Sequence, residues 1–153
     1  MHSLFNTAYQ AHPALAIAAE TVLPALGLLA LVLPATEWKA GRLKFPELFW
    51  VCALVSITLV YILRYFCHPA GHWIRPGMNY STHTAVAISL AVTLVMCRPM
   101  LLPAVVIVVG AYLWLITFLG YHTPGDAIST GAVILPLSVL CHLPWLLSYR
   151  RGR

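Results

Sequence analysis

The sequence predicts an all-α integral membrane protein, a single domain over residues 1–153 that forms a bundle of about five transmembrane helices. The first two observations behind this prediction are compositional: 61% of the 153 residues are hydrophobic, and only 8% are Asp, Glu, Lys or Arg. Soluble domains are about a quarter charged, and disordered chains combine low hydrophobicity with high charge, so both classes are excluded. The third observation is five apolar stretches of about 20 residues, the length that crosses a bilayer as a helix.

The first three predicted spans are Pro13–Ala35, Glu47–Phe66 and Ser81–Cys97. Each must be helical, because unpaired backbone groups are too costly in lipid. The first span contains Glu20, which we expect either to face the bundle interior or to lie near the interface. The second ends where the first outer loop begins. The third is short, so its polar start must lie at the interface.

The fourth and fifth predicted spans are Leu101–Gly120 and Asp126–Ser148. The fourth is the most apolar, since no charged residue occurs from Pro99 through Tyr121. The fifth begins after a Thr-Pro-Gly-Asp segment, in which proline and glycine favour a tight turn into the helix. We expect His142, inside the fifth span, to be a packed or interfacial histidine.

The placement of basic residues predicts the orientation in the membrane. Seven of the nine fall in the first loop, the third loop and the tail, which share one side if there are five spans. The positive-inside rule then places the N-terminus outside and the C-terminus in the cytoplasm. We expect an integral protein of a bacterial cytoplasmic membrane, with lipid and not nucleic acid as partner despite a net charge of +5. The seven residues are Lys39, Arg42, Lys44, Arg98, Arg150, Arg151 and Arg153.

The two predicted outer loops hold an unusual share of the polar chemistry. They contain four of the seven histidines, the only aspartate of the chain, Asp126, and both remaining arginines, Arg64 and Arg75. Ionisable groups near a membrane are costly and are therefore candidate functional residues. The four histidines are His68, His72, His83 and His122.

The residue types at these helix ends suit phosphoryl transfer. Ser81 and Thr82 are natural N-cap residues before His83, and a helix N-terminus there favours a bound anion. Asp126 lies four residues after His122, so its carboxylate could fix the imidazole and leave the other ring nitrogen as base or nucleophile. Arg75 supplies a planar cation that suits phosphate oxygens.

The order of these residues resembles the type 2 phosphatidic acid phosphatase superfamily, including its sphingomyelin synthase branch. Arg75-Pro76, then Ser81-Thr82-His83, then His122-Thr-Pro-Gly-Asp126 are similar to its three motifs. The resemblance implies a lipid phosphatase or headgroup phosphotransferase that needs no metal or other cofactor. It implies that His122 is the nucleophile, Asp126 its orienting residue and His83 the acid for the leaving group. The phosphate-binding residues that it implies are Arg75, Ser81, His68 and Thr82.

The sequence also departs from the pattern of that superfamily. His68 stands where its first motif has lysine, and Thr82 stands where its second motif has glycine. Leu115-Ile116 replace Ser-Arg of the third motif, and five spans are predicted where the superfamily usually has six. These departures leave the nucleophile in place and weaken the expected hold on phosphate.

Three other interpretations remain open from the sequence. His122 and Asp126 could form a structural pair that closes a loop, and Arg64 and Arg75 could extend to lipid headgroups. Glu20 and the outer histidines could form a proton or ion relay in a small transporter. The four outer histidines could instead bind a metal ion or a haem.

Overall fold

The computed structural model describes residues 12–67, 73 and 78–151, and within them the chain is helical with short turns and no strand. The all-α prediction is therefore confirmed for this part of the chain. A 3₁₀ turn, η1 (Pro99–Leu101), precedes the fourth helix. The helices are α2 (Pro13–Lys39), α3 (Pro46–Cys67), α4 (Thr82–Cys97), α5 (Leu102–Phe118) and α6 (Pro124–Arg151).

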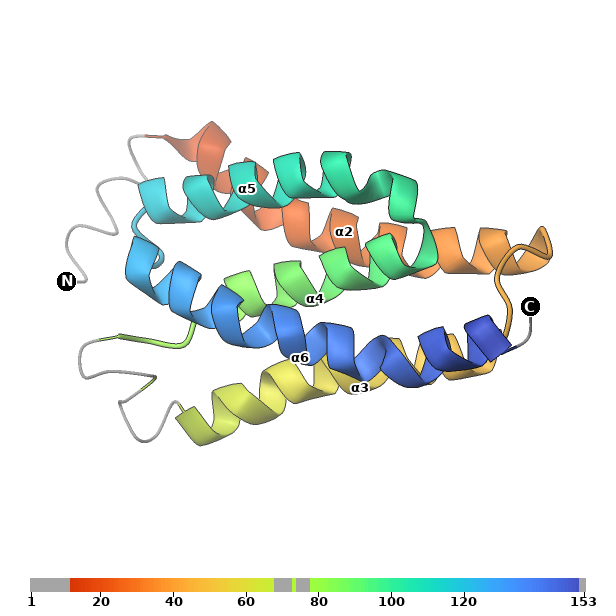
Figure 1. Cartoon of the computed structure of the whole chain (residues 1–153). Coiled ribbons are helices and arrows are strands. Elements are labelled where there is room, and N and C mark those ends of the chain that lie inside the picture. Colours follow the sequence, from red (N-terminus) through yellow and green to blue (C-terminus); the bar gives the residue numbers. More distant parts are fainter. Residues whose placement is uncertain (1–11, 68–72, 74–77, 152–153) are drawn as a thin grey trace.

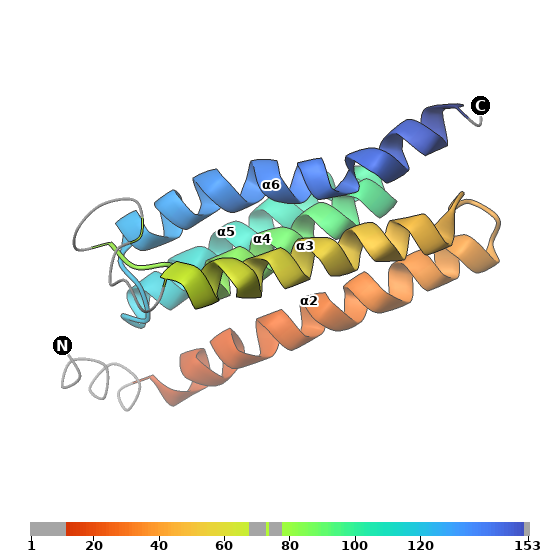
Figure 2. The same cartoon turned by 90° about the horizontal axis from the view of Figure 1, so that it is seen from below.

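The helices run alongside one another in an up-and-down bundle (Figures 1 and 2). The start of α2, the end of α3, the start of α4 and the α5–α6 turn lie at one end, drawn on the left of Figure 1. The α2–α3 and α4–α5 connections and the end of α6 lie at the other end. Five antiparallel helices thus leave the start of α2 and the end of α6 at opposite ends of the bundle.

The short helix α4 is the centre of the bundle, because it packs against α2, α3, α5 and α6. Eight of its 16 residues are buried, and most of these eight are Ala, Ser or Thr. Small side chains let neighbouring helices approach closely in a membrane. Shielding by four other helices also explains how the shortest helix can carry so many small and hydroxyl-bearing side chains.

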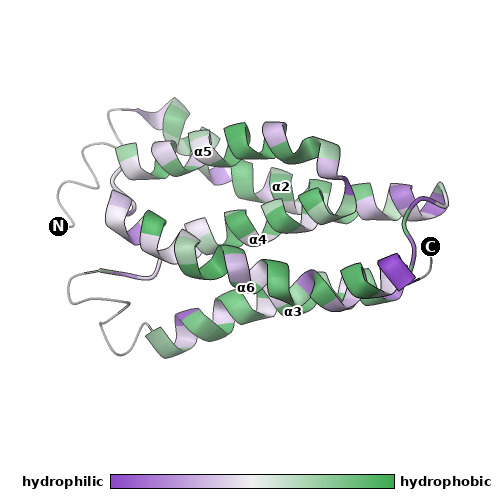
Figure 3. Ribbon diagram, in the orientation of Figure 1, coloured by the Kyte–Doolittle hydropathy of each residue, from purple (hydrophilic) through white to green (hydrophobic). Residues whose placement is uncertain are grey.

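Four of the helical segments are long and apolar enough to cross a membrane, and α4 is a shorter apolar helix. Their outer faces carry large exposed side chains, and Figure 3 shows the apolar character along each helix. An exposed apolar surface this extensive is not tolerated by a monomeric soluble protein. It fits a lipid bilayer. The most exposed of these side chains include Leu28, Leu54, Ile107 and Ile128.

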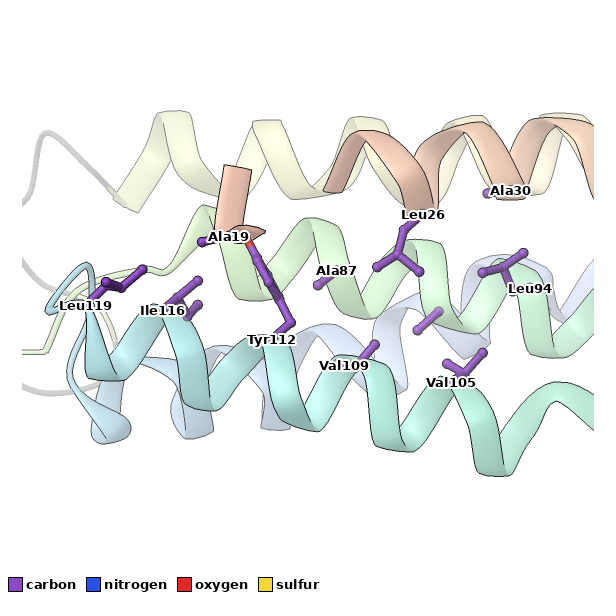
Figure 4. Packing of buried hydrophobic residues seen from close by; sticks show 11 residues of the cluster. Ala19, Leu26, Ala30, Ala87, Leu94, Val105, Val109, Tyr112, Ile116 and Leu119 are labelled. Carbon is purple, nitrogen blue, oxygen red and sulfur yellow. The ribbon is translucent and has the colours of Figure 1, made fainter. Parts of the chain in front are cut away.

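The largest hydrophobic cluster joins α2, α4 and α5, and Figure 4 shows its side chains between these three helices. A separate set of buried polar contacts joins α3, α4 and α6. The hydroxyl oxygens of Ser56 and Ser89 lie 2.7 Å apart. His142 is fully buried, with Nδ1 2.9 Å from the carbonyl of Ser138 and Nε2 3.4 Å from the Thr93 hydroxyl. The expectation that His142 is a packed residue is confirmed.

Candidate functional site

Two of the predicted site residues, His83 and His122, meet at the end of the bundle where α4 begins and α5 turns into α6. Their ring centroids lie 5.7 Å apart at an angle of 58°. The ring of Tyr121 lies at the same distance, 5.7 Å, from that of His83. Residues 39 positions apart in the sequence are thus brought within reach of one small substrate group.

The position of His83 is fixed by a capped helix start. Ser81 is the N-cap residue of α4, and its hydroxyl accepts a hydrogen bond from the Thr84 N–H at 3.3 Å. Ser81 is fully buried, and its hydroxyl also lies 2.8 Å from that of Thr84. The predicted cap is confirmed. The contact of Ser81 with a phosphate stays a prediction.

The position of His122 is fixed by the way α5 ends. Gly120 has φ +76°, a left-handed conformation that costs glycine little. Its N–H donates to the carbonyl of Thr117 at 3.0 Å, and the N–H of Tyr121 donates to the carbonyl of Ile116 at 3.0 Å. This pair of bonds is a Schellman motif, which reverses the chain at a helix end. It turns Tyr121 and His122 back toward the start of α4.

Helix α6 begins with a capping box that the sequence analysis missed. The Asp126 N–H donates to the Thr123 hydroxyl at 3.2 Å, and the Thr123 N–H donates to Asp126 Oδ2 at 3.1 Å. Pro124 occupies the first helical position, where its missing N–H has no cost. The signal was present, because threonine followed three residues later by an acid is the pattern of such a box.

Two hydrogen bonds tie the starts of α4 and α6 together. The N–H of Asn79 donates to Asp126 Oδ1 at 2.7 Å, and the N–H of Ser81 donates to the Thr130 hydroxyl at 3.0 Å. Both carboxylate oxygens of the buried Asp126 therefore accept from backbone groups. Among the described residues, no hydrogen bond joins Asp126 to His122, so the predicted orienting contact stays a prediction.

The surroundings of His122 favour the neutral form of its imidazole. Burial lowers its pKa below the ordinary value of 6.5, and the nearby charge of His83 lowers the pKa further. The Asp126 carboxylate acts in the opposite direction and is the smallest of the three influences. A neutral imidazole has a free lone pair at one nitrogen, which a nucleophile or a base requires.

Arg64, at the end of α3, contributes a positive charge to this site. From the sequence, Arg64 was expected only to extend toward lipid headgroups. Its guanidinium Nη1 donates to the Thr82 hydroxyl at 3.1 Å. Thr82 is the first residue of α4 and directly precedes His83. The signal in the sequence was that Arg64 lies on the same predicted side of the membrane as His83 and His122.

Two predicted phosphate-binding residues, His68 and Arg75, lie outside the described residues. Between them in the chain lies Trp73, whose indole ring has its centroid 4.8 Å from that of the Tyr80 ring. The Tyr80 hydroxyl donates to the carbonyl of Val60 at 3.0 Å, and burial raises the pKa of this phenol. Tyr80 thereby holds the segment that leads into α4 against α3.

A cavity of about 290 Å³ opens beside His83, between α2, α4 and α5. Glu20 lines it, as does Tyr112, a residue that the sequence analysis passed over in the most apolar span. A single tyrosine in a charge-free span was the signal that could have found it. The other lining residues are Ala19, Leu23, Pro24, Ile116 and Tyr121.

Histidine, cysteine and acidic side chains do not gather as a metal site in the part of the chain that the structure describes. No group of three or more of them there could hold an ion. Of the four histidines in that interpretation, His68 and His72 lie outside the described residues. The metal or haem interpretation therefore stays untested.

No family model, no curated protein and no solved structure matches this chain. The resemblance to the phosphatase superfamily thus rests on the motif residues named above.

Proposed function

We propose that this protein is a membrane enzyme that acts on the phosphate of a lipid, by hydrolysis or by headgroup transfer, through a phosphohistidine at His122. The observation that carries the proposal is the pair of histidine rings, 5.7 Å apart, at two adjoining helix ends. One ring is held by the capped start of α4 and the other by the Schellman turn after α5. Such a pair provides a nucleophile and an acid on either side of one phosphorus atom.

The proposed reaction has two steps. An imidazole nitrogen of His122 attacks phosphorus, the bond from phosphorus to the lipid oxygen breaks, and His83 gives its proton to that oxygen. Water, or a second alcohol, then attacks phosphorus, the bond from phosphorus to the His122 nitrogen breaks, and the attacking oxygen gives its proton to His83. The lowered pKa of His122 supports this role, because the attacking ring must be neutral.

Arg64 compensates in part for the motif positions that this chain lacks. The resemblance implies phosphate contacts from Arg75, Ser81, Thr82 and His68, with histidine in place of the usual lysine. Arg64 brings a permanent positive charge to the hydroxyl of Thr82 at 3.1 Å. A guanidinium suits the planar recognition of phosphate oxygens, so Arg64 and Arg75 would share the phosphate.

The proposed site faces the outside of the cell and works on the outer leaflet. It lies at the bundle end where α2 begins, opposite the end that carries the first loop, the third loop and the tail. Those segments hold seven of the nine basic residues, and the positive-inside rule places them in the cytoplasm.

The decisive test is phosphate release or headgroup exchange by the purified protein on a panel of phospholipids in mixed micelles. We expect activity that survives a chelator and is lost in His122→Ala. The matched control is His12→Ala, since His12 is an exposed histidine just before α2 and outside the proposed site. Retention of activity in His122→Ala would overturn the mechanism.

A proton or ion relay is the second candidate function, and one observation favours it. Glu20 and His83 line the same cavity. A carboxylate and an imidazole within a membrane protein form a common proton path. Proton flux into liposomes that is lost in Glu20→Gln, without any phosphate chemistry, would select this function.

A further inference from the structure

The cavity between α2, α4 and α5 contains two buried polar atoms that the rest of the described chain does not satisfy. These atoms are the hydroxyl oxygen of Tyr112 and Nδ1 of His83. Tyr112 is only 2% exposed, and Figure 4 shows its side chain reaching from α5 toward α2, next to Ala19. A buried polar group without a partner is costly, so native proteins rarely keep one unless a ligand or water forms a hydrogen bond with it.

The side chains of the cavity wall indicate which kind of ligand could form hydrogen bonds there. Glu20 offers a carboxylate, which accepts hydrogen bonds, and Tyr112 offers a hydroxyl, which donates and accepts. The remaining wall is apolar apart from His83 and Tyr121. An alcohol suits these two side chains, because its oxygen can accept a hydrogen bond from the Tyr112 hydroxyl while its own O–H donates one to the Glu20 carboxylate. An ammonium group has no acceptor for the Tyr112 proton.

The position of the cavity indicates which part of a lipid reaches it. His83 is the second residue of α4 and lies at the bundle end. Tyr112 lies six residues before the end of α5 at Phe118, which is about 9 Å deeper at 1.5 Å per residue. The cavity thus leads from His83 toward the apolar layer, so it meets a lipid at the backbone that joins the headgroup to the chains and not at the headgroup itself.

We infer that this cavity binds the free hydroxyl of a lipid backbone, with Glu20 and Tyr112 as its hydrogen-bond partners. At about 290 Å³ the cavity accommodates a glycerol-sized unit and the first carbons of a chain, but not a whole lipid. The identity of the occupant rests on the proposed function: it is the lipid part of the substrate, whose ester oxygen receives the proton of His83. The hydroxyl bound by Glu20 and Tyr112 is a second, free hydroxyl of the same lipid. The preferred substrates then carry a free hydroxyl next to the phosphate ester.

The test measures equilibrium binding of a monoacylglycerol to the full chain in detergent micelles, against the same lipid with its hydroxyls methylated. We expect Tyr112→Phe and Glu20→Gln each to weaken monoacylglycerol binding about tenfold, the loss of one hydrogen bond of about 1.4 kcal/mol, and to leave the methylated lipid unaffected. The matched controls are Tyr61→Phe and Glu47→Gln on α3, which lie outside the cavity lining.

The results separate this inference from its alternatives. Equal binding of the free and methylated lipids would overturn it, as would tighter binding of an alkylammonium of the same chain length. Binding needs no phosphate and no reaction, so His122→Ala should retain it even though phosphate release is lost. Tyr112→Phe removes an oxygen without a protein partner, so we expect the ligand-free variant to unfold at the same temperature as the wild type or higher. A lower unfolding temperature would show that the Tyr112 hydroxyl is satisfied within the protein and would overturn the inference.

Discussion

Replacement of Asp126 tests whether the two starts of α4 and α6 are held together as the structure indicates. Asp126→Ala removes both acceptors, those of the Asn79 N–H at 2.7 Å and the Thr123 N–H at 3.1 Å. Asp126→Asn retains one oxygen for Asn79 and presents an NH₂ group to the Thr123 N–H. Two donors cannot pair, so this variant should lose one of the two bonds.

The expected magnitude follows from the charge and the exposure of the partners. Hydrogen bonds to a charged group contribute about 1.5 to 3 kcal/mol each. Asn79 and Thr123 are exposed residues, so water can partly replace the lost acceptor, and the lower value applies. We therefore expect Asp126→Ala to lower the free energy of unfolding by about 3 kcal/mol, and Asp126→Asn by about 1.5 kcal/mol.

The measurement is reversible unfolding of the purified protein in mixed micelles as the fraction of denaturing detergent is raised. Glu47→Ala is the matched control, because Glu47 is the acidic residue in the first turn of α3 and is exposed. Its loss should cost about 0.3 to 1 kcal/mol, the interaction with the helix dipole alone. If Asp126→Ala costs no more than Glu47→Ala, the reasoning is refuted.

Three further predictions concern the same end of the bundle. Gly120→Ala places a β-carbon at φ +76° and should cost about 1 to 2 kcal/mol by the same unfolding assay, whereas Gly110→Ala inside α5 should be neutral or stabilising. Thr130→Val removes the acceptor of the buried Ser81 N–H and should cost about 1 to 3 kcal/mol, and an unchanged stability would contradict that bond. The His122 imidazole, followed by NMR of histidine-labelled protein, should titrate below pH 6.5, and at higher pH in His83→Gln, because that variant removes a positive neighbour. Stability should fall as the pH drops from 6.5 toward the folded pKa, because only the unfolded chain then binds the proton.

The buried Glu37 shows how the two ends of the bundle differ. Its carboxylate lies within 3.7 Å of the Arg98 guanidinium and also accepts hydrogen bonds from Arg42. Three charged residues of the expected cytoplasmic end therefore hold the end of α2 against the α4–α5 connection. At the opposite end, Asp126, Arg64 and the histidines bond to backbone and hydroxyl groups or face a cavity. The basic end is thus closed by ion pairs, and the histidine end retains room for a ligand.

The class of protein, the helical spans and the cap at Ser81 could be predicted from the sequence alone, because each depends on residues that are contiguous in the chain. Hydropathy over about 20 residues is enough to locate a span. The cap at Ser81 and the proline start of α6 depend on side chains within three residues of the helix start. The same locality led us to expect that Asp126 would contact its chain neighbour His122.

The identity of the central helix and the details of contacts between distant residues could be seen only once the helices were packed together. In lipid both the outer face and the packed face of a helix are apolar, so the sequence carries no stripe that marks the interior. The central place of α4 and the pairing of Asp126 with Asn79, 47 residues away, therefore had no signal in the sequence pattern. The approach of His83 to His122 was expected from the motif resemblance and from their shared side of the membrane, and only its geometry came from the structure. Tyr112 stood out in the sequence only as the single tyrosine of an apolar span; the packing of α2 against α4 and α5 placed it in the wall of a cavity, with its hydroxyl buried and without a hydrogen-bond partner among the described residues.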